Sequence, residues 1–431
     1  MDCALIDAEP PVDECPPRVR FGDETYRRRV KTPNTLGTLF GPIRVPRCIY
    51  ECLEPGEPCI APLEMQLGVV AGLATPALAE RVGRWSAEHP QQAVLALVEA
   101  EHGVHWSVDS LRKVTRAVRD GVKDPGVKAR QDRLIELLAE AEQSSGKHRP
   151  TLAVGRDGVM IPIRGQGYQE AATGTVSVHD RRGQRLGTVY LAEMPEPGQQ
   201  RLTKQMTAMV TAAIATWHAL GQSCPRLAYL TDGGHHQQEF FRKVLAKMKD
   251  PWRPGQKLAW QWTIDFFHAC EHLWKQAEAL FGASSPAAWA WYRRMRHWLR
   301  HRGDGVADIL RSATQHFNQR KLSASRHEMF AAAYRYLRRH APWMDYAANK
   351  RQRLPIGSGV TEAACKTVFT QRLKCSGMTW QVEGGQVIVD LRVLVLSGVW
   401  ERSYAANLEA QPMPQPVSHQ PRVRKTAQIA A

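Results

Sequence analysis

The chain has 431 residues, of which 58 are lysine or arginine and 42 are aspartate or glutamate, so its formal net charge at pH 7 is +16. A chain of this length has room for about two to four domains or subdomains with ample core, and the surplus positive charge favours a polyanionic partner. We expect no membrane span, because the apolar run 387–400 is interrupted by Asp390 and Arg392. No signal peptide is expected either, and nine cysteines without a regular framework indicate reduced thiols in a cytosol.

The N-terminal region divides into two short stretches. Prolines and mixed charge predict a flexible arm over residues 1–30. Residues 31–62 read as a short-stranded module, with two brief strands around the Gly41-Pro42 turn. Its cysteines, Cys48, Cys52 and Cys59, resemble an incomplete zinc ribbon. Neither pair has Cys-x-x-Cys spacing, so the pattern favours a metal-free knuckle over structural Zn²⁺.

Residues 63–142 have a helical pattern and are a candidate DNA-binding region. A helix over 91–101, a turn containing Gly103 and a helix over 108–119 fit helix-turn-helix geometry. The second helix carries basic residues suited to a DNA groove, Arg112, Lys113 and Arg116. An ordinary packed helix pair fits the same pattern. Residues 143–150 read as a linker.

The catalytic core is predicted over 150–270 and 354–402, with a helical insertion over 271–353 and a disordered tail over 403–431. The expected order of the core is β-β-β-α-β-α-β followed by helices, which is the ribonuclease H-like layout: an α/β fold with a mixed sheet and helices on its faces. The expected elements are strands at 151–157, 173–179, 186–191, 227–232 and 257–265, with helices at 199–220 and 237–248.

Three acidic residues lie at the ends of elements in this predicted order. Asp157 and Asp232 each follow an apolar strand, and Glu362 opens a helix after Gly-Ser-Gly. A single Asp-Gly is usually only a turn, so the prediction depends on three sites occurring in the right topological order. Carboxylate oxygens suit Mg²⁺ or Mn²⁺, and a pair of such ions can cleave and join phosphodiesters. The sequence therefore predicts Mg²⁺-dependent chemistry on nucleic acid.

The junction at Asp265 and His268 allows several interpretations. The pair contacts a scissile phosphate, or it holds the end of the sheet in shape. Asp265 also competes with Asp232 as the second metal ligand, and strand order favours Asp232. The letters His268-x-x-Glu271-His272 match the zinc site of inverted metalloproteases, although a protease would leave Asp157, Asp232 and the positive charge unused.

Basic and aromatic residues follow the third acid. Lys366 lies four residues after Glu362 and therefore shares its helical face. Lys366, Arg372 and Lys374 are candidates for positioning phosphates, with surface ion pairs as the plainer alternative. Trp380 either stacks on an unpaired base or is buried in the core.

Several segments together resemble a known family. They are 157–162 (DGVMIP), 230–233 (LTDG), 264–274 (IDFFHACEHLW), 355–362 (PIGSGVTE) and 372–380 (RLKCSGMTW), with 38–41 (TLFG) and 62–64 (PLE) upstream. The chain resembles the DDE transposases of bacterial insertion sequences, in the Mutator-like group (the Kra-type insertion-sequence family). The resemblance covers nearly the whole chain apart from the tail. Its most specific parts are Asp-x-x-His and Gly-Ser-Gly-x-x-Glu.

This resemblance implies a ribonuclease H-like catalytic domain with an all-helical insertion before the acidic helix. It implies Mg²⁺-dependent cleavage at terminal inverted repeats, followed by attack of the freed 3′-OH on target DNA. Asp157, Asp232 and Glu362 would take the DDE positions, and Asp265 and His268 the accessory position. The partners would be double-stranded DNA and further copies of the chain, as a dimer or larger assembly, in the nucleoid of a bacterial cytoplasm. The alternatives are a non-catalytic DNA-binding relic and a zinc metalloprotease.

Overall fold

The computed structural model describes residues 15–410 and 412–417. The chain divides into two compact units, one formed by Met1–Pro125 with Glu401–Ala431 and the other by Gly126–Trp400. Within the described residues, no helix combines the length and apolar character needed to cross a membrane.

The first unit contains a four-stranded antiparallel sheet in the order β3-β2-β1-β9. Its strands are β1 (Arg18–Phe21), β2 (Glu24–Thr38), β3 (Gly41–Cys52) and β9 (Gln415–Pro416). The predicted flexible arm is therefore wrong for residues 18–30, and its residues 1–14 lie outside the described part. Basic side chains on the outer face of this sheet obscure the alternation of apolar and polar residues in the sequence. Val19, Tyr26 and Tyr50 are buried in a small core.

The predicted tail also needs correction. Residues 403–409 lie in α16 (Trp400–Glu409), and Gln415–Pro416 pairs with β1. Residue 411 and residues 418–431 lie outside the described part. Buried Tyr404 anchors α16, because its hydroxyl donates to the Pro76 carbonyl at 2.8 Å.

Four helices follow the sheet: α2 (Pro62–Gln66), α3 (Pro76–Glu88), α4 (Gln91–His102) and α5 (Val108–Gln143). The turn after α4 uses Gly103 at φ 60°, a left-handed conformation that favours glycine. Helix α5 runs well past the predicted end at 119, through Pro125. Its Gly126 serves packing, since a Cβ there would lie 2.6 Å from Leu394 Cδ2.

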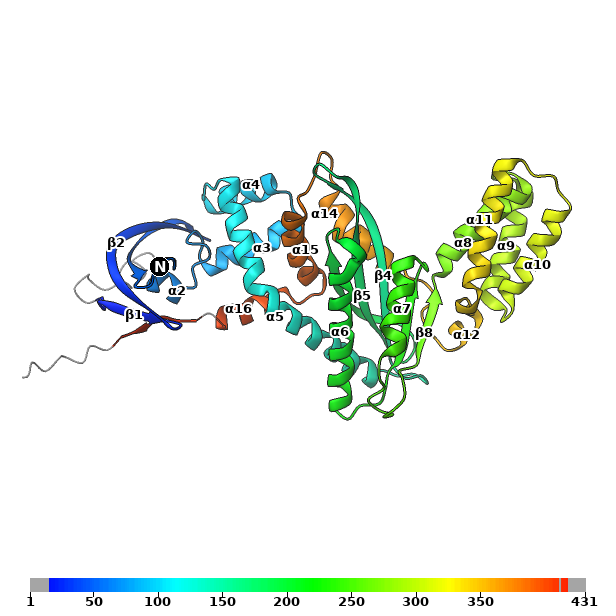
Figure 1. The fold of residues 1–431 in the computed structure, drawn as a ribbon, viewed down its shortest axis with the longest axis horizontal. Helices are drawn as coiled ribbons and strands as arrows, with labels where there is room; N and C mark the ends of the chain where they lie inside the picture. Colours follow the sequence, from blue (N-terminus) through cyan, green and yellow to red (C-terminus); the bar gives the residue numbers. More distant parts are fainter. Residues whose placement is uncertain (1–14, 411, 418–431) are drawn as a thin grey trace, which may run out of the picture. The chain divides into compact units, whose positions relative to one another are not determined.

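The second unit is mixed α/β and is built on a five-stranded sheet in the order β6-β5-β4-β7-β8 (Figure 1). The strands are β4 (Thr151–Ile163), β5 (Gly167–His179), β6 (Arg185–Glu193), β7 (Arg226–Thr231) and β8 (Trp260–Ile264). Strands β4, β5 and β6 are antiparallel, whereas β7 pairs parallel to β4 and to β8. The sheet is therefore mixed, as the sequence predicts.

One strand end was predicted wrongly. Asp157 lies inside β4, because β5 stays paired with β4 as far as Ile163. The parallel pairing of β4 with β7 nevertheless stops at Gly155 opposite Leu230. Asp157 thus lies two residues past the parallel part of the sheet, at the level where β7 also ends.

Helices cover both faces of this sheet. Leu202, Met206 and Val210 of α6 (Gln200–Ala219) join the main core with Val176, and Phe240 of α7 (His235–Lys243) belongs to it. On the opposite face, Val389 and Val393 of α15 (Val382–Leu396) pack with Ile161 and Ala192. Each sheet face therefore has its own apolar contacts.

The helical insertion follows β8, and Figure 1 shows its long helices bundled together. It comprises α8 (Phe266–Phe281), α9 (Pro286–His301), α10 (Gly305–Asn318), α11 (Ala324–His340) and α12 (Tyr346–Arg351). The chain then returns to the sheet through α13 (Gly359–Ala364), a π-helical turn at Cys365–Thr370, and α14 (Gln371–Leu373).

Candidate carboxylate site

Asp157 is the most constrained of the three predicted acids. The Gly158 N–H donates to its Oδ1 at 2.8 Å, and the Cys365 thiol donates to its Oδ2 at 3.5 Å. The pKa of Asp157 is raised to about 6, chiefly by burial, and the charges of Asp232 and Glu362 act in the same direction. The two hydrogen bonds do not fully offset these effects.

Asp232 is held from two sides at the end of β7. Its Oδ1 accepts the Gly234 N–H at 3.0 Å, and its backbone carbonyl accepts the Tyr336 hydroxyl of α11 at 2.7 Å. Gly233 has φ 84°, and a Cβ there would lie 2.8 Å from His340 Nε2. Glycine is therefore required at this position by both conformation and space.

Glu362 reaches the site on a helix that is pressed against the sheet. The Thr361 hydroxyl of α13 hydrogen-bonds the Thr175 hydroxyl of β5 at 2.7 Å, and Cys365 Sγ contacts Thr173 Oγ1 at 3.2 Å. A Cβ on Gly155 would overlap Thr361 Oγ1, so glycine in β4 makes this approach possible. Glu362 itself is exposed and keeps freedom to move. The adjoining π-helical turn is a feature often found at functional sites.

The three acids are near enough for their charges to interact, since Asp232 and Glu362 both act on Asp157. Within residues 15–410 and 412–417, however, no three acidic, histidine or cysteine side chains are already grouped so that they could hold a metal ion. The donor set is all oxygen, which fits Mg²⁺ or Mn²⁺. A divalent cation would also relieve the repulsion felt by Asp157. The residues fit the ion chemically, and exposed Glu362 would have to close onto it.

Asp265 is held by backbone hydrogen bonds on both of its carboxylate oxygens. Its side chain is buried, its Oδ1 accepts the His268 N–H at 2.6 Å, and its Oδ2 accepts the Ser358 N–H. Asp265 therefore caps α8 and clamps the segment that leads into α13. Its backbone N–H also donates to the Thr231 carbonyl at 2.8 Å. Asp157 also accepts hydrogen bonds at both oxygens, so strand order remains the argument for Asp232 as the second ligand.

The histidines of the metalloprotease pattern are engaged with other side chains. His268 Nδ1 lies 3.4 Å from Glu271 Oε2. The His272 ring stacks on Tyr336, with centroids 3.7 Å apart and planes 9° from parallel. Burial, and then the charge of His268, lower the pKa of His272 to about 4. Stacking on Tyr336 does not favour a zinc role for His272.

The basic residues after Glu362 fall into two groups. Lys366 and Lys374 are exposed and free to meet a phosphate. Arg372 is 1% exposed, its guanidinium lies 5.4 Å from the centroid of the Trp380 ring, and burial lowers its pKa to about 10. Arg372 was predicted to position phosphate, and this needs correction, because solvent and DNA do not reach it in this conformation.

Trp380 is partly buried, and its polar atoms are bonded within the fold. Its indole N–H donates to the Leu373 carbonyl at 2.9 Å. Its backbone N–H donates to the Pro162 carbonyl at 3.2 Å, and its carbonyl accepts the Arg164 N–H at 2.9 Å. Through this parallel pairing with Ile163, Trp380 connects the segment after α14 to the end of β4.

The predicted basic face of α5 is accessible. Arg112, Lys113 and Arg116 are all exposed. Asp109 lies 3.6 Å from Arg112, on the surface, where such a pair contributes little. This face is available to an anionic partner.

Cys15, Cys48 and Cys52 belong to one small core. Cys48 is buried with its Sγ 3.2 Å from Sγ of Cys15, Cys52 is partly buried, and Cys59 is exposed. Cys15 was not considered in the sequence prediction. Since the described residues contain no metal-binding group, the structure gives no support to Zn²⁺ at Cys48, Cys52 and Cys59.

Two features of the second unit were not predicted from the sequence. One is Tyr336, 104 residues from the carbonyl that it holds. The other is a cationic pocket of about 340 Å³ between α9 and α12, lined by Arg300, His301, Ala347, Lys350, Arg351 and Arg353. No carboxylate lines this pocket. Loss of hydration, and then the charges of Lys350, His297 and Arg300, lower the pKa of His301.

Comparison with models of known protein families and with curated proteins finds no match for this sequence.

Proposed function

We propose that the chain is a DNA transposase that uses Asp157, Asp232 and Glu362 to cleave and join DNA strands with Mg²⁺. One observation carries the proposal: Asp157 is largely buried where the charges of two further acids act on it, Asp232 directly after β7 and Glu362 on α13, and its pKa is raised. Mutually repelling carboxylates destabilise a fold unless a cation neutralises them. Such an arrangement is typical of a functional site.

The strand order supports this proposal. A mixed sheet ordered β6-β5-β4-β7-β8, with the acids on β4, after β7 and on a later helix, fits the ribonuclease H-like layout. The insertion lies between the second and third acids, as the resemblance to DDE transposases implies. The Asp-x-x-His motif has a structural explanation as well, because Asp265 caps α8 by accepting the N–H of His268.

The chain's own residues would divide the work as follows. Asp157 and Asp232 would provide fixed oxygen ligands, and Glu362, with its longer and exposed side chain, would complete the set. When bound, Mg²⁺ would supply activation of the attacking oxygen and stabilisation of the leaving oxygen. Tyr336 and Asp265 would hold the backbone that carries Asp232 and Glu362.

Charge supports DNA as the partner. The net charge is +16, α5 exposes Arg112, Lys113 and Arg116, and the insertion has a pocket with five cationic or histidine side chains and no carboxylate. We further propose that at least two copies act together, because two element ends must be held for joining. The Zn²⁺ protease alternative gains no support from the stacked His272.

The decisive experiment is incubation of the full chain with labelled duplex DNA ending in the terminal inverted repeat that flanks its gene. We expect Mg²⁺-dependent breaks at the repeat end. Asp157→Asn, Asp232→Asn and Glu362→Gln should each abolish cleavage but retain DNA binding. Glu140→Gln is the matched control, because Glu140 is exposed on α5, an element that carries none of the three acids.

The outcomes separate the alternatives. Binding without cleavage in Mg²⁺ or Mn²⁺ would indicate a DNA-binding relic. Proteolysis lost in Glu271→Gln would indicate the metalloprotease. Full cleavage in any of the three acid variants would remove that residue from the site.

A further inference from the structure

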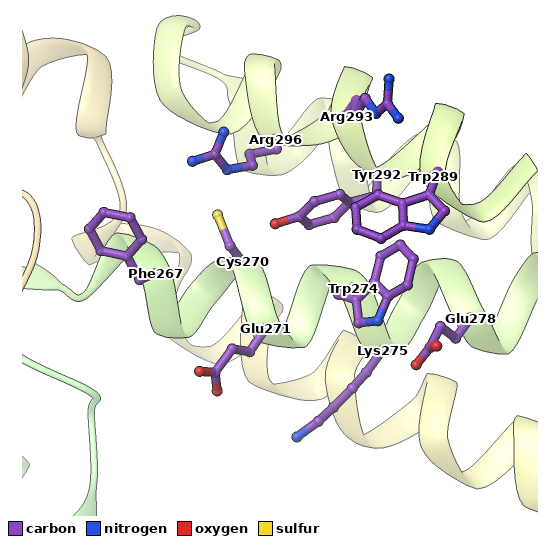
Figure 2. A pocket seen from close by; sticks show the side chains of 10 residues that line it. All are labelled: Phe267, Cys270, Glu271, Trp274, Lys275, Glu278, Trp289, Tyr292, Arg293 and Arg296. Carbon is purple, nitrogen blue, oxygen red and sulfur yellow. The ribbon is translucent and has the colours of Figure 1, made fainter. Parts of the chain in front are cut away.

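A groove of about 780 Å³ runs between α8 and α9 of the helical insertion (Figure 2). Residues at spacings of three and four along each helix line it, so one face of each helix forms a wall. The residues that matter for its chemistry are Phe267, Trp274, Trp289, Tyr292, Arg293 and Arg296.

The groove presents aromatic faces that the fold leaves partly uncovered. Trp274 and Trp289 have ring centroids 4.3 Å apart, and Tyr292 meets Trp274 edge-on at 5.3 Å. Trp289 is 43% exposed and Phe267 is 57% exposed. Large aromatic side chains gathered in one open groove indicate a binding surface.

The α9 wall of the groove is positively charged. Helix α9 contains no aspartate or glutamate, and Arg293 lies with its guanidinium 5.9 Å from the Trp289 ring centroid. Glu271, Lys275 and Glu278 of α8 also line the groove (Figure 2), so its positive side is the α9 wall, where Arg293 and Arg296 lie. Among the described residues, no carboxylate forms an ion pair with Arg293.

This combination selects one kind of occupant. Flat aromatic faces beside guanidinium groups suit a base linked to a phosphate, because the base stacks and the phosphate pairs with arginine. An apolar protein segment would instead cover Arg293 and Arg296 without supplying a counter-charge, which is costly.

The groove begins close to the candidate site. Phe267 follows Asp265 by two residues, and a Cβ on Gly357 would lie 2.9 Å from the Phe267 ring. Gly357 belongs to the segment that Asp265 clamps, just ahead of α13 and Glu362. The near end of the groove therefore adjoins the segment that carries the third acid.

We propose that this groove holds an unpaired base of the DNA strand end that the carboxylate site processes, with Trp289 as the main stacking surface and Arg293 beside the adjoining phosphate. The proposal deepens the proposed function and rests on it for the identity of the strand. The binding step itself requires neither Mg²⁺ nor cleavage.

The test compares two fluorescein-labelled duplexes of equal length, one with a flush end and one with several unpaired nucleotides at the 3′ end. Affinities for the full chain are measured by anisotropy without divalent metal. We expect the wild type to prefer the frayed duplex. Trp289→Ala should lower this preference about 5- to 150-fold, the range for one stacked base, and leave flush-end affinity unchanged.

Control variants separate stacking from folding. Trp289→Phe keeps a ring and should retain most of the preference. Phe40→Ala removes an 82% exposed ring between β2 and β3 and should leave the ratio of the two affinities unchanged. Arg293→Ala should weaken frayed-end binding and reduce its dependence on salt.

Unchanged preference in a folded Trp289→Ala variant would overturn the proposal. The proposal would also be overturned if Trp289→Ala changed the oligomeric mass of the protein but kept its preference for the frayed duplex. That result would make the groove an interface between protein chains. If DNA is cleaved but Trp289 has no effect, the groove assignment alone fails. If frayed ends bind through Trp289 but no metal supports cleavage, the proposed function alone fails.

Discussion

Gly155→Ala tests how the third acid is brought to the sheet. A Cβ on Gly155 would overlap Thr361 Oγ1, lie 2.8 Å from Thr175 Oγ1 and lie 3.1 Å from Thr361 Cβ. Since ordinary contact begins at 3.4 Å, the Thr175 contact alone requires a shift of 0.6 Å (3.4 − 2.8). The overlap with Thr361 requires more, so α13 must move outward and carry Glu362 with it.

The expected cost follows from this shift. Overpacking of this kind costs about 1–3 kcal/mol of stability, which leaves the second unit folded. A displacement of about 1 Å in a catalytic group costs about 10²-fold in rate. We therefore expect Gly155→Ala to lower Mg²⁺-dependent cleavage about 10²-fold, with DNA binding close to that of the wild type.

The matched control is Gly359→Ala at the start of α13, where a Cβ would meet nothing within 4 Å. It should keep full activity, and alanine should favour the helix. Cleavage rate and DNA affinity are measured for both variants, with thermal melting as a check on folding. Wild-type cleavage by Gly155→Ala would show that α13 does not depend on this approach, and the assignment of Glu362 would lose its structural basis.

Two further predictions concern the carboxylate site, and a third concerns the cationic pocket between α9 and α12. Because the folded pKa of Asp157, about 6, lies above the ordinary value of 3.8 for aspartate, the stability that its protonation contributes is lost as pH rises through about 6. At pH 8 without divalent metal, Asp157→Asn should therefore melt at a higher temperature than the wild type, with a free energy of unfolding that is greater by at most about 3 kcal/mol. Only the wild type should gain stability from Mg²⁺. Equal melting temperatures at pH 8 would contradict this prediction. Tyr336→Phe removes the hydroxyl that holds the Asp232 carbonyl but keeps the ring on His272, so cleavage should fall about tenfold at unchanged DNA affinity, and unchanged cleavage would remove Tyr336 as a positioning residue. Lys350→Glu should weaken DNA binding and lower the slope of log affinity against log salt by about 1. Arg338→Glu makes the same change of charge at an exposed position of α11 and should have little effect. Equal effects of the two variants would indicate that net charge alone determines the affinity for DNA.

The sequence was informative where apolar patterning and local chemistry act together. The apolar run before Asp232 marks β7, and the helices of the insertion follow their periodicity. Asp157 was placed at a strand end because the apolar run stops before it, and Asp-Gly is itself a common turn. Pairing with β5 overrides that local preference and continues β4 to Ile163. The basic residues of β2 similarly concealed a strand with a buried face.

Long-range contacts account for what the sequence did not reveal. Burial of Arg372 against Trp380 depends on how the segment after the π-helical turn folds back on β4. The two oxygens of Asp265 find donors at His268, close in sequence, and at Ser358, which is 93 residues away. Only the first of these is visible in the sequence, as a capping pattern. The contact between Tyr336 and Asp232 leaves no local pattern at all.

The central claim is that three acids from separate elements serve one divalent ion site. Crystals of the chain soaked in Mn²⁺ test it directly, because anomalous scattering locates the ion independently of any assumed ligand. We expect a peak at about 2.0–2.2 Å from carboxylate oxygens of Asp157 and Asp232, with Glu362 turned towards it. A peak ligated by Asp265 or by His268 and His272, or no peak beside Asp157, would contradict the account.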